Sequence, residues 1–430
     1  MGKGFTALLL LLAAACGRDE QCPAAPGAQV PAALCGQVAE LALPEALPPA
    51  RGNDHADDPG AATFGHRVFF DARFSKSLQV RCATCHQTER SFQDGAPTPP
   101  GFLTVHRRTP TVINAARLSL QFWDGRADSL WSQALFALEN PGEMDFTRLE
   151  IAHLVDTLYR ARYEPVFGPL PDFSDAQRFP PRGAPGDAAW NAMAAADQAQ
   201  VNRVAANVGK ALEAYQRKAA AGPSRLEAWL SGDRAALSAQ EVAGVGVFAR
   251  AGCLACHSGP MLTDERYHVL GAPDGAGAEV DRGRAAGLAL LQANPFNARG
   301  PYFDGPAPAP DDRDVASPAL EGAFRTPSLR NLGKRAPYGH GGTFASLEDA
   351  VDFHLRGGGA GGTASDGGTG SAGVSDGGTG SDGGTGGART PDPLLQPHPL
   401  SPEDRASLLA FLRALDGKYP GIPWADWPRG

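Results

Sequence analysis

The sequence carries one short pattern twice, first as Cys82-Ala-Thr-Cys85-His86 and again as Cys253-Leu-Ala-Cys256-His257. A run of the form C-x-x-C-H is typical of a site where a c-type haem is attached. Its two thiols form thioethers with the porphyrin vinyl groups, and the adjacent histidine binds the iron as the proximal ligand. The alternatives are a thioredoxin-like C-x-x-C and a zinc half-site, although zinc would need a second close pair of Cys or His at each motif. We therefore predict two covalently bound haem c groups, held by Cys82 and Cys85 with His86 as iron ligand, and by Cys253 and Cys256 with His257.

Three of the seven cysteines lie outside these motifs. Residues 1–15 combine Lys3, a short apolar stretch and three alanines directly before Cys16, which is typical of an export signal. A cysteine after small residues also resembles a bacterial lipobox. We therefore expect a periplasmic protein that is held at the membrane only by a lipid on Cys16. In that oxidising compartment Cys22 and Cys35 can form a disulfide, with two free thiols as the alternative.

The acidic balance of the chain argues against nucleic acid as a partner. There are 47 Asp and Glu against 39 Lys and Arg, a formal net charge of −8, whereas a phosphate-binding surface needs clustered Lys and Arg. Beyond the leader there is no apolar run of about 20 residues, so a polytopic membrane protein is excluded as well.

Helix signals recur in the same order in the two halves of the chain. A Pro- and Ala-rich stretch at 16–57, which we interpret as a tether, is followed by Asp58-Pro59, the predicted start of a helix that runs to about residue 70. The capping box Ser238-Ala-Gln-Glu241 starts a helix directly before the second C-x-x-C-H motif. A last helix with an apolar stripe follows Ser401.

These signals predict a mostly α protein, because strand signals are scarce. We expect two cytochrome c-like domains, residues 58–230 and 231–430, each with one covalently attached c-type haem. The second domain contains Ser-Asp-Gly-Gly-Thr-Gly three times within residues 357–387. Nothing in that stretch can form a core, so we expect a disordered insert.

Six further motifs occur in a fixed order along the chain. They are Phe69-Phe70-Asp71-x-Arg73, Thr109-Pro110-Thr111 with Asn114, Phe122-Trp123-Asp124-Gly125-Arg126, Pro141-Gly142-Glu143-Met144, Thr326-Pro327-Ser328-Leu329-Arg330-Asn331 and Ala336-Pro337-Tyr338-x-His340-x-Gly342. Together they resemble the bacterial dihaem cytochrome c peroxidase/MauG family, and the similarity runs through nearly all of residues 59–415 apart from the Gly-rich insert.

The resemblance implies that hydrogen peroxide reacts at the His86 haem, with a Gln and a Glu on its distal side. They stand ten and twenty residues after the Trp of the F-W-D-G-R motif, at Gln133 and Glu143. A carboxylate there can take a proton from one peroxide oxygen and return it to the other, and an amide can orient the peroxide. Without the resemblance, Glu143 would be interpreted as a surface carboxylate.

Trp123 matches the family's tryptophan between the haems, which is implicated in passing electrons from the second haem to the first. An indole is large and oxidisable, so it suits this role. An ordinary core tryptophan is the alternative, and the two roles are compatible.

The family places the outer ligand of the second haem fourteen residues after the position of His340, which is His354 in this chain. Peroxidases of the family have Met at this position, and MauG-like enzymes have Tyr. Helical spacing puts Leu347, Val351 and His354 on one face. A second imidazole gives a low-spin, six-coordinate iron and should lower its reduction potential relative to Met. A surface histidine before a glycine run is the alternative.

Two other departures from the family concern the first haem and calcium. Peroxidases that rest inactive hold a distal His over the first haem, but the matching stretch 97–101 contains none and His106 is offset by several residues. We therefore expect an open, five-coordinate first haem that needs no reductive activation. The family's interdomain Ca²⁺ uses an Asn where this chain has Arg108, and a cation at that position disfavours Ca²⁺, so calcium stays open.

Three functions follow from the resemblance. The first is a peroxidase that reduces hydrogen peroxide at the first haem with electrons from a small periplasmic donor, a cytochrome c or a cupredoxin, through the second haem. The second is a MauG-like oxidase that modifies a side chain of a partner protein. The third, a non-catalytic dihaem electron carrier, is disfavoured because a carrier has no use for Gln133 and Glu143. The oligomeric state stays open, with a homodimer as one alternative.

Overall fold

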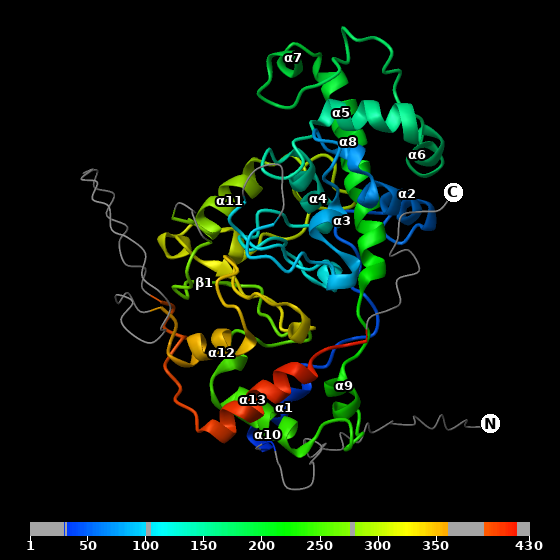
Figure 1. Ribbon diagram of the computed structural model, residues 1–430. Coiled ribbons are helices and arrows are strands. Elements are labelled where there is room, and N and C mark those ends of the chain that lie inside the picture. Colours follow the sequence, from blue (N-terminus) through cyan, green and yellow to red (C-terminus); the bar gives the residue numbers. More distant parts are fainter. Residues whose placement is uncertain (1–29, 31, 100–104, 276–279, 360–390, 419–430) are drawn as a thin grey trace, which may run out of the picture.

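A computed structural model describes residues 30, 32–99, 105–275, 280–359 and 391–418 (Figure 1). The expected leader at 1–15, with Cys16 and Cys22, lies outside these described residues, as do residues 360–387 of the expected insert. The chain is mostly helical, as predicted, and the described strands β1 (Tyr267–His268) and β2 (Phe324–Arg325) form one short antiparallel pair. Among the described residues, no helix has the length and apolar character needed to cross a membrane.

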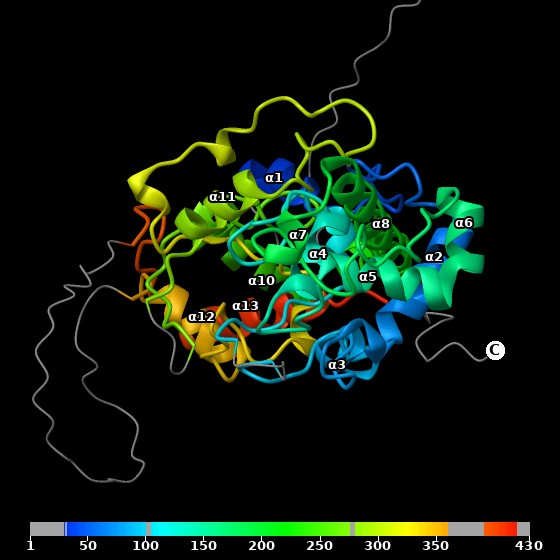
Figure 2. The same ribbon diagram turned by 90° about the horizontal axis from the view of Figure 1, so that it is seen from above.

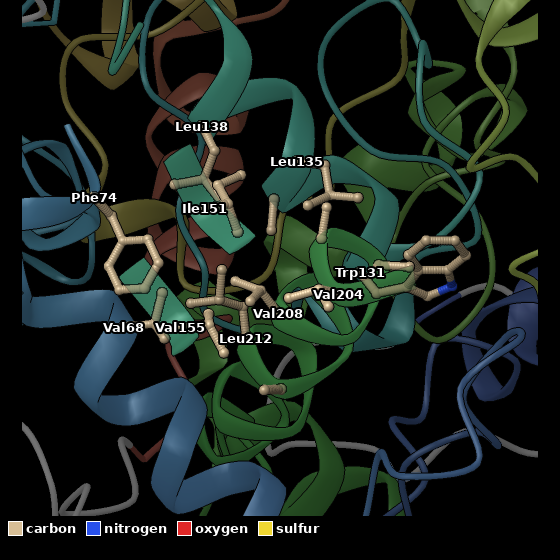
Figure 3. Packing of buried hydrophobic residues seen from close by; sticks show 14 of the residues in the cluster. Val68, Phe74, Trp131, Leu135, Leu138, Ile151, Val155, Val204, Val208 and Leu212 are labelled. Atoms are coloured by element: carbon tan, nitrogen blue, oxygen red, sulfur yellow. The ribbon is translucent and has the colours of Figure 1, made fainter. Parts of the chain in front are cut away.

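The first group of helices is built from residues 59–216. Its members are α2 (Pro59–Phe70), α3 (Cys82–Cys85), α4 (Leu130–Glu139), α5 (Arg148–Leu154), α6 (Arg160–Phe167), α7 (Ala188–Asn191) and α8 (Ala195–Gln216). The predicted start of α2 is confirmed, because the Asp58 side chain accepts a hydrogen bond from Ala61 N at 2.8 Å and Pro59 takes the first helical position. The long α8 packs against both α2 and α4. Figure 3 shows the buried side chains that meet there, among them Val68, Trp131, Leu135, Val204, Val208 and Leu212.

The second group of helices surrounds the second C-x-x-C-H motif. It consists of α1 (Cys35–Ala39), α9 (Arg225–Leu230), α10 (Ala239–Arg250), α12 (Leu347–Leu355) and α13 (Pro402–Ala414). The predicted capping box of Ser238 and Glu241 starts α10, and Ser401 caps α13. Helix α11 (Arg284–Ala293) is late in the sequence but lies beside α4 of the first group in both views (Figures 1 and 2). Asn294, directly after α11, donates through Nδ2 to Ser132 Oγ of α4 at 3.4 Å.

In each group, the helix before the C-x-x-C-H motif crosses a partner helix at a glycine. A Cβ atom on Gly65 of α2 would lie 1.9 Å from the carbonyl oxygen of Ala211 in α8, and one on Gly244 of α10 would lie 2.0 Å from that of Ser407 in α13. Only glycine permits such close backbone approach. In both pairs the first helix precedes the C-x-x-C-H motif, so the two halves share one arrangement around their motifs.

The buried side chains form two large cores whose limits differ from the expected domain limits. The first core runs from Phe64 to Ala221 and also takes in Phe296 and Tyr302 from the second half of the chain. The second core already includes Leu226 and Trp229 of α9. The boundary between the cores therefore falls before α9 and not at residues 230/231.

The described part of the expected tether is folded and not extended. Val30, Cys35, Val38 and Leu41 are buried in the second core, and Leu43 N donates to Glu227 Oε1 at 3.1 Å. Cys35 is disulfide-bonded, whereas Cys82, Cys253 and Cys256 are free thiols. The interpretation of residues 16–57 as a tether is therefore wrong from Val30 onward, because these few apolar side chains find a buried partner surface that local sequence does not reveal.

Loops from the two halves meet between the cores. Gln93 Nε2 donates to the carbonyl of Lys334 at 2.6 Å, and Arg108 N donates to the carbonyl of His340 at 2.8 Å. Arg325 N of β2 donates to the carbonyl of Trp123 at 2.8 Å. The segment that contains Trp123 is thus held directly against the second half of the chain.

Candidate functional site

The first C-x-x-C-H motif follows α2 and forms the short helix α3 with His86 at its end. The Nδ1 atom of His86 lies 3.2 Å from the carbonyl oxygen of Phe92. Phe69 of α2 packs near this imidazole, with ring centroids 6.3 Å apart. Burial lowers the pKa of His86, so the ring is neutral at physiological pH. A neutral imidazole with its Nδ1 hydrogen-bonded to a carbonyl is the form that binds iron through Nε2.

The second motif repeats this local geometry. It follows α10 directly, and the Nδ1 atom of His257 lies 3.0 Å from the carbonyl oxygen of Leu262. Burial, with a smaller contribution from the His354 side chain, lowers the pKa of His257 to about 4. The two C-x-x-C-H histidines therefore have the same carbonyl partner geometry, although the loops that supply the carbonyls differ in length.

A cavity adjoins the second motif and brings five of the predicted site residues together. Cys253, Cys256 and His257 line it, and so do His354 of α12 and Trp123 from the first half of the chain. Much of the remaining wall is apolar, with Phe248, Leu329, Phe344, Val351 and Leu412 among its residues. An apolar cavity bordered by two cysteines and a neutral imidazole fits the flat, largely apolar haem ring.

His354 lines the cavity with one of its two ring nitrogens engaged. Its Nδ1 lies 2.7 Å from the carbonyl oxygen of Ala350, one helical turn earlier, which leaves Nε2 for a metal. His268 also lines the cavity, but both of its ring nitrogens lie on carboxylates, Asp392 at 2.6 Å and Asp264 at 3.0 Å. Met261 and His398 line the cavity too, and sequence analysis had singled out neither.

Trp123 lies at the boundary between the cores. Its indole Nε1 donates a hydrogen bond to the carbonyl oxygen of Arg108 at 2.9 Å. Its own carbonyl accepts from Arg325 N, so both ends of the residue are fixed, and its side chain reaches the cavity of the second motif.

Glu143 is placed near the first motif. Burial, with a smaller contribution from the negative charge of Glu143, raises the pKa of the Cys82 thiol to about 12. Burial also raises the pKa of the Glu143 carboxyl itself, against the opposing effects of Arg126 and of a hydrogen bond from Asn140 Nδ2 to Oε1 at 2.7 Å. Sequence analysis missed Asn140, although an Asn that caps the end of α4 two residues before Gly142 is a recognisable turn signal.

Gln133 lies on α4, one turn before Phe136. The Phe136 ring contacts Phe122 at 6.0 Å between centroids, and the guanidinium of Arg126 stacks 3.4 Å from the Phe122 ring. Arg126 also acts on the charge of Glu143, whereas the contacts of the described residues do not link the Gln133 side chain to Glu143. Their side chains form no hydrogen bond with each other among the described contacts.

The loop position that the family uses for calcium carries a buried arginine. The Arg108 guanidinium donates through Nη2 to Gln93 Oε1 and to the carbonyl of Arg335. A side-chain cation and its hydrogen bonds thus occupy this part of the boundary between the cores.

Comparison with known proteins places the chain in a family. Residues 59–235 match the model of the di-haem cytochrome c peroxidase family. The chain is 31% identical over 328 residues to the methylamine utilization protein MauG of Methylorubrum extorquens, covering 76% of each protein. It is 29% identical over 394 residues to the cytochrome c551 peroxidase of Pseudomonas aeruginosa, covering 90% of this chain and 86% of that enzyme.

Solved structures agree on the fold. A MauG-like protein associated with microbial copper homeostasis superposes with a TM-score of 0.60 at 23% identity, over 90% of this chain and 98% of that one. The dihaem peroxidase BthA of Burkholderia thailandensis gives a TM-score of 0.58 at 21% identity, over 88% and 94% of the two chains.

The fold and these similarities define a haem enzyme of the peroxidase type. The chain belongs to the di-haem cytochrome c peroxidase family, which includes both peroxidases and MauG-like oxidases.

Proposed function

We propose that this enzyme reduces hydrogen peroxide to water at a haem attached to Cys82 and Cys85, with His86 as the proximal ligand. Cys253, Cys256, His257 and His354, which line one cavity, would hold a second haem that would pass electrons to the first. Each haem supplies an iron that exchanges electrons, and the first one also binds peroxide. The observation that carries the proposal is the partly buried Glu143 carboxyl, which accepts a hydrogen bond from Asn140, has a raised pKa and acts electrostatically on Cys82 of the first motif.

Glu143 has the position and the chemistry of an acid–base group. Its ionised carboxylate takes the proton from one peroxide oxygen and returns it to the other, which leaves as water. Two electrons and two further protons complete the reduction of H₂O₂ to two molecules of water. Gln133, whose amide does not titrate, orients the peroxide by hydrogen bonding, and the hydrogen bond from Asn140 holds Glu143 in place.

Trp123 carries electrons between the two sites in this proposal. Its support is the location of the side chain at the second cavity and its two backbone-directed hydrogen bonds across the boundary between the cores. The C-x-x-C-H geometry, repeated in both halves after a glycine-crossed helix, supports two cytochrome c-like domains with covalently bound haem.

The cellular setting is part of the proposal. Covalent haem attachment takes place outside the cytoplasm, so we place the enzyme in the periplasm, anchored by a lipid on Cys16. A small cytochrome c or a cupredoxin serves as electron donor.

A MauG-like role is the second candidate, and the identity to MauG of Methylorubrum extorquens favours it. The same residues would then use peroxide to oxidise a side chain of a partner protein. Steady-state peroxide reduction with reduced cytochrome c or cupredoxin separates the two roles, because only the peroxidase would take its electrons from such a donor.

Optical and EPR spectra of the oxidised protein, before and after peroxide addition, test the proposal. We expect one high-spin haem and one low-spin bis-histidine haem that react with H₂O₂ without prior reduction. Two low-spin haems that are inert to peroxide would contradict it.

A further inference from the structure

Two nearly buried arginines line the cavity at the second motif without an ion-pair partner. Arg108 is 6% exposed and Arg325 is 8% exposed, and neither forms a salt bridge within the described part of the chain. Other buried arginines do: Arg284 pairs with Asp314 at 2.9 Å, Arg330 with Glu227 at 2.7 Å and Arg148 with Glu139 at 2.6 Å.

The hydrogen bonds of the two guanidinium groups are incomplete. Arg108 donates only through Nη2, to Gln93 Oε1 and the carbonyl of Arg335. Arg325 makes two long contacts, from Nε to the carbonyl of Phe122 at 3.3 Å and from Nη1 to that of Thr326 at 3.4 Å. A guanidinium has five N–H donors, so each group keeps donors without an acceptor among the described residues.

The carboxylates whose charges act on these two arginines accept hydrogen bonds from other groups. Asp94, whose charge acts on Arg108, accepts from Thr109 Oγ1 at 2.7 Å. Glu265, whose charge acts on Arg325, accepts from the backbone N–H groups of Ser119 and Leu120 at 2.8 and 3.1 Å. Burial lowers the pKa of Arg108 to about 10, and nearby Arg335 adds further positive charge. Neither carboxylate forms an ion pair with its arginine in the described part of the chain, and a buried cation without such direct contact is unfavourable, so this wall of the cavity favours an anion.

We propose that Arg108 and Arg325 bind the two propionate groups of the second haem. This inference rests on the proposed function, because it needs a haem attached at Cys253 and Cys256. A haem has an apolar ring with two carboxylates on one edge, and the cavity has an apolar wall with two guanidinium groups that form no salt bridge with the described residues. Arginine suits this role, because its planar fork binds carboxylates bidentately.

The same two residues also hold Trp123. The carbonyl of Arg108 accepts from the Trp123 indole, and Arg325 N donates to the Trp123 carbonyl. Propionate binding therefore turns the carboxylate edge of the second haem toward Trp123. Arg108 and Arg325 are positioning residues for electron transfer, and their positive charge stabilises the reduced haem relative to the oxidised one.

The test is an optical redox titration of the haem-loaded protein and its variants Arg108→Gln and Arg325→Gln at several pH values. We expect each variant to shift the second haem's reduction equilibrium at least tenfold toward the oxidised form, which is about 59 mV for a one-electron couple. Its potential should also become more pH-dependent near neutrality, because a propionate without its arginine is protonated more easily. Arg108→Lys and Arg325→Lys keep the positive charge but lose the planar guanidinium that binds a carboxylate bidentately. Their reduction potentials for the second haem should lie between those of the wild type and the Gln variants.

Arg107→Gln is the matched control. Arg107 is the chain neighbour of Arg108, but its charge is already balanced by Asp281, at 2.6 and 2.7 Å, and by Asp124. Potentials and pH profiles of the Arg108 and Arg325 variants that match those of Arg107→Gln, with haem content intact, would overturn the inference. If a Gln variant does not accumulate with haem, the inference is tested by comparing the pH profile of the corresponding Lys variant with that of Arg107→Gln. Wild-type protein without a haem at Cys253 and Cys256 would instead contradict the proposed function.

Discussion

The indole Nε1 of Trp123 donates a hydrogen bond to the carbonyl oxygen of Arg108, 2.9 Å away, across a tight loop of the first half of the chain. Arg108 N in turn donates to the carbonyl of His340 in the second half. The orientation of Trp123 is therefore coupled to the contact between the two cores.

Trp123→Phe should lower kcat for peroxide reduction while leaving peroxide binding unchanged, because it removes the indole from the path between the haem sites. Trp131→Phe is the control, since Trp131 also donates its indole N–H to a carbonyl, that of Arg51 at 3.2 Å, but does not line the cavity. Each change removes one hydrogen bond and should cost about 1 kcal/mol of stability. Steady-state kinetics with a reduced donor should show a lower kcat for Trp123→Phe than for Trp131→Phe. Equal loss of kcat in both variants would argue against a role for Trp123 in electron transfer.

Glu143→Gln should lower kcat/KM for H₂O₂ by about 10²–10⁴-fold, the usual contribution of a positioned acid–base group. In the wild type the carboxyl must be ionised to accept the proton, so kcat/KM should fall as the pH drops through its raised pKa. The Gln variant should lose this decrease in kcat/KM at low pH, the acidic limb of the pH profile.

The variant Asn140→Ala tests whether Glu143 is the group that titrates in this experiment. The hydrogen bond from Asn140 lowers the pKa of Glu143, so its removal should raise that pKa further and move the acidic limb to higher pH. A limb that stays in place in Asn140→Ala and persists in Glu143→Gln would assign the titration to another group.

His354→Ala should convert the second haem from low spin to high spin, because it removes the cavity-lining imidazole that we propose as an iron ligand. His398→Ala and Met261→Ala remove the other candidate ligands that line the same cavity, and should leave the EPR spectrum unchanged. A low-spin signal that survives His354→Ala but disappears in one of the other two would identify that residue as the ligand.

Dialysis against EGTA should leave the optical spectra and the peroxidase rate unchanged. The Arg108 guanidinium already donates to the Arg335 carbonyl at the boundary between the cores, and a calcium ion beside it would be repelled. Activity that is lost on dialysis and restored by Ca²⁺ alone would contradict this expectation.

Local signals in the sequence predicted the features that depend on local physics. Asp58, Ser238 and Ser401 cap the helices they were expected to start. Helical spacing placed His354 on the face of α12 that carries the buried Leu347 and Val351, and the side chain does line the cavity.

Features that depend on tertiary contacts were not predictable in this way. The Pro- and Ala-rich composition of residues 30–43 hides four side chains that are buried only because a distant surface covers them. Likewise, nothing in a single sequence distinguishes Arg325, which forms no salt bridge with the described residues, from Arg330 five positions later, which pairs with Glu227.

The burial of Val30 to Leu41 in the second core means that this core is assembled from both ends of the described chain, with the first core inserted between them. Leu43 and Glu227, joined by a hydrogen bond, are 184 residues apart, whereas the first core is closed mostly by one continuous stretch. During synthesis the first core can therefore complete itself early, while the N-terminal segment must wait for α13 to emerge. High contact order of this kind slows folding, so the second haem site should be the later of the two to mature.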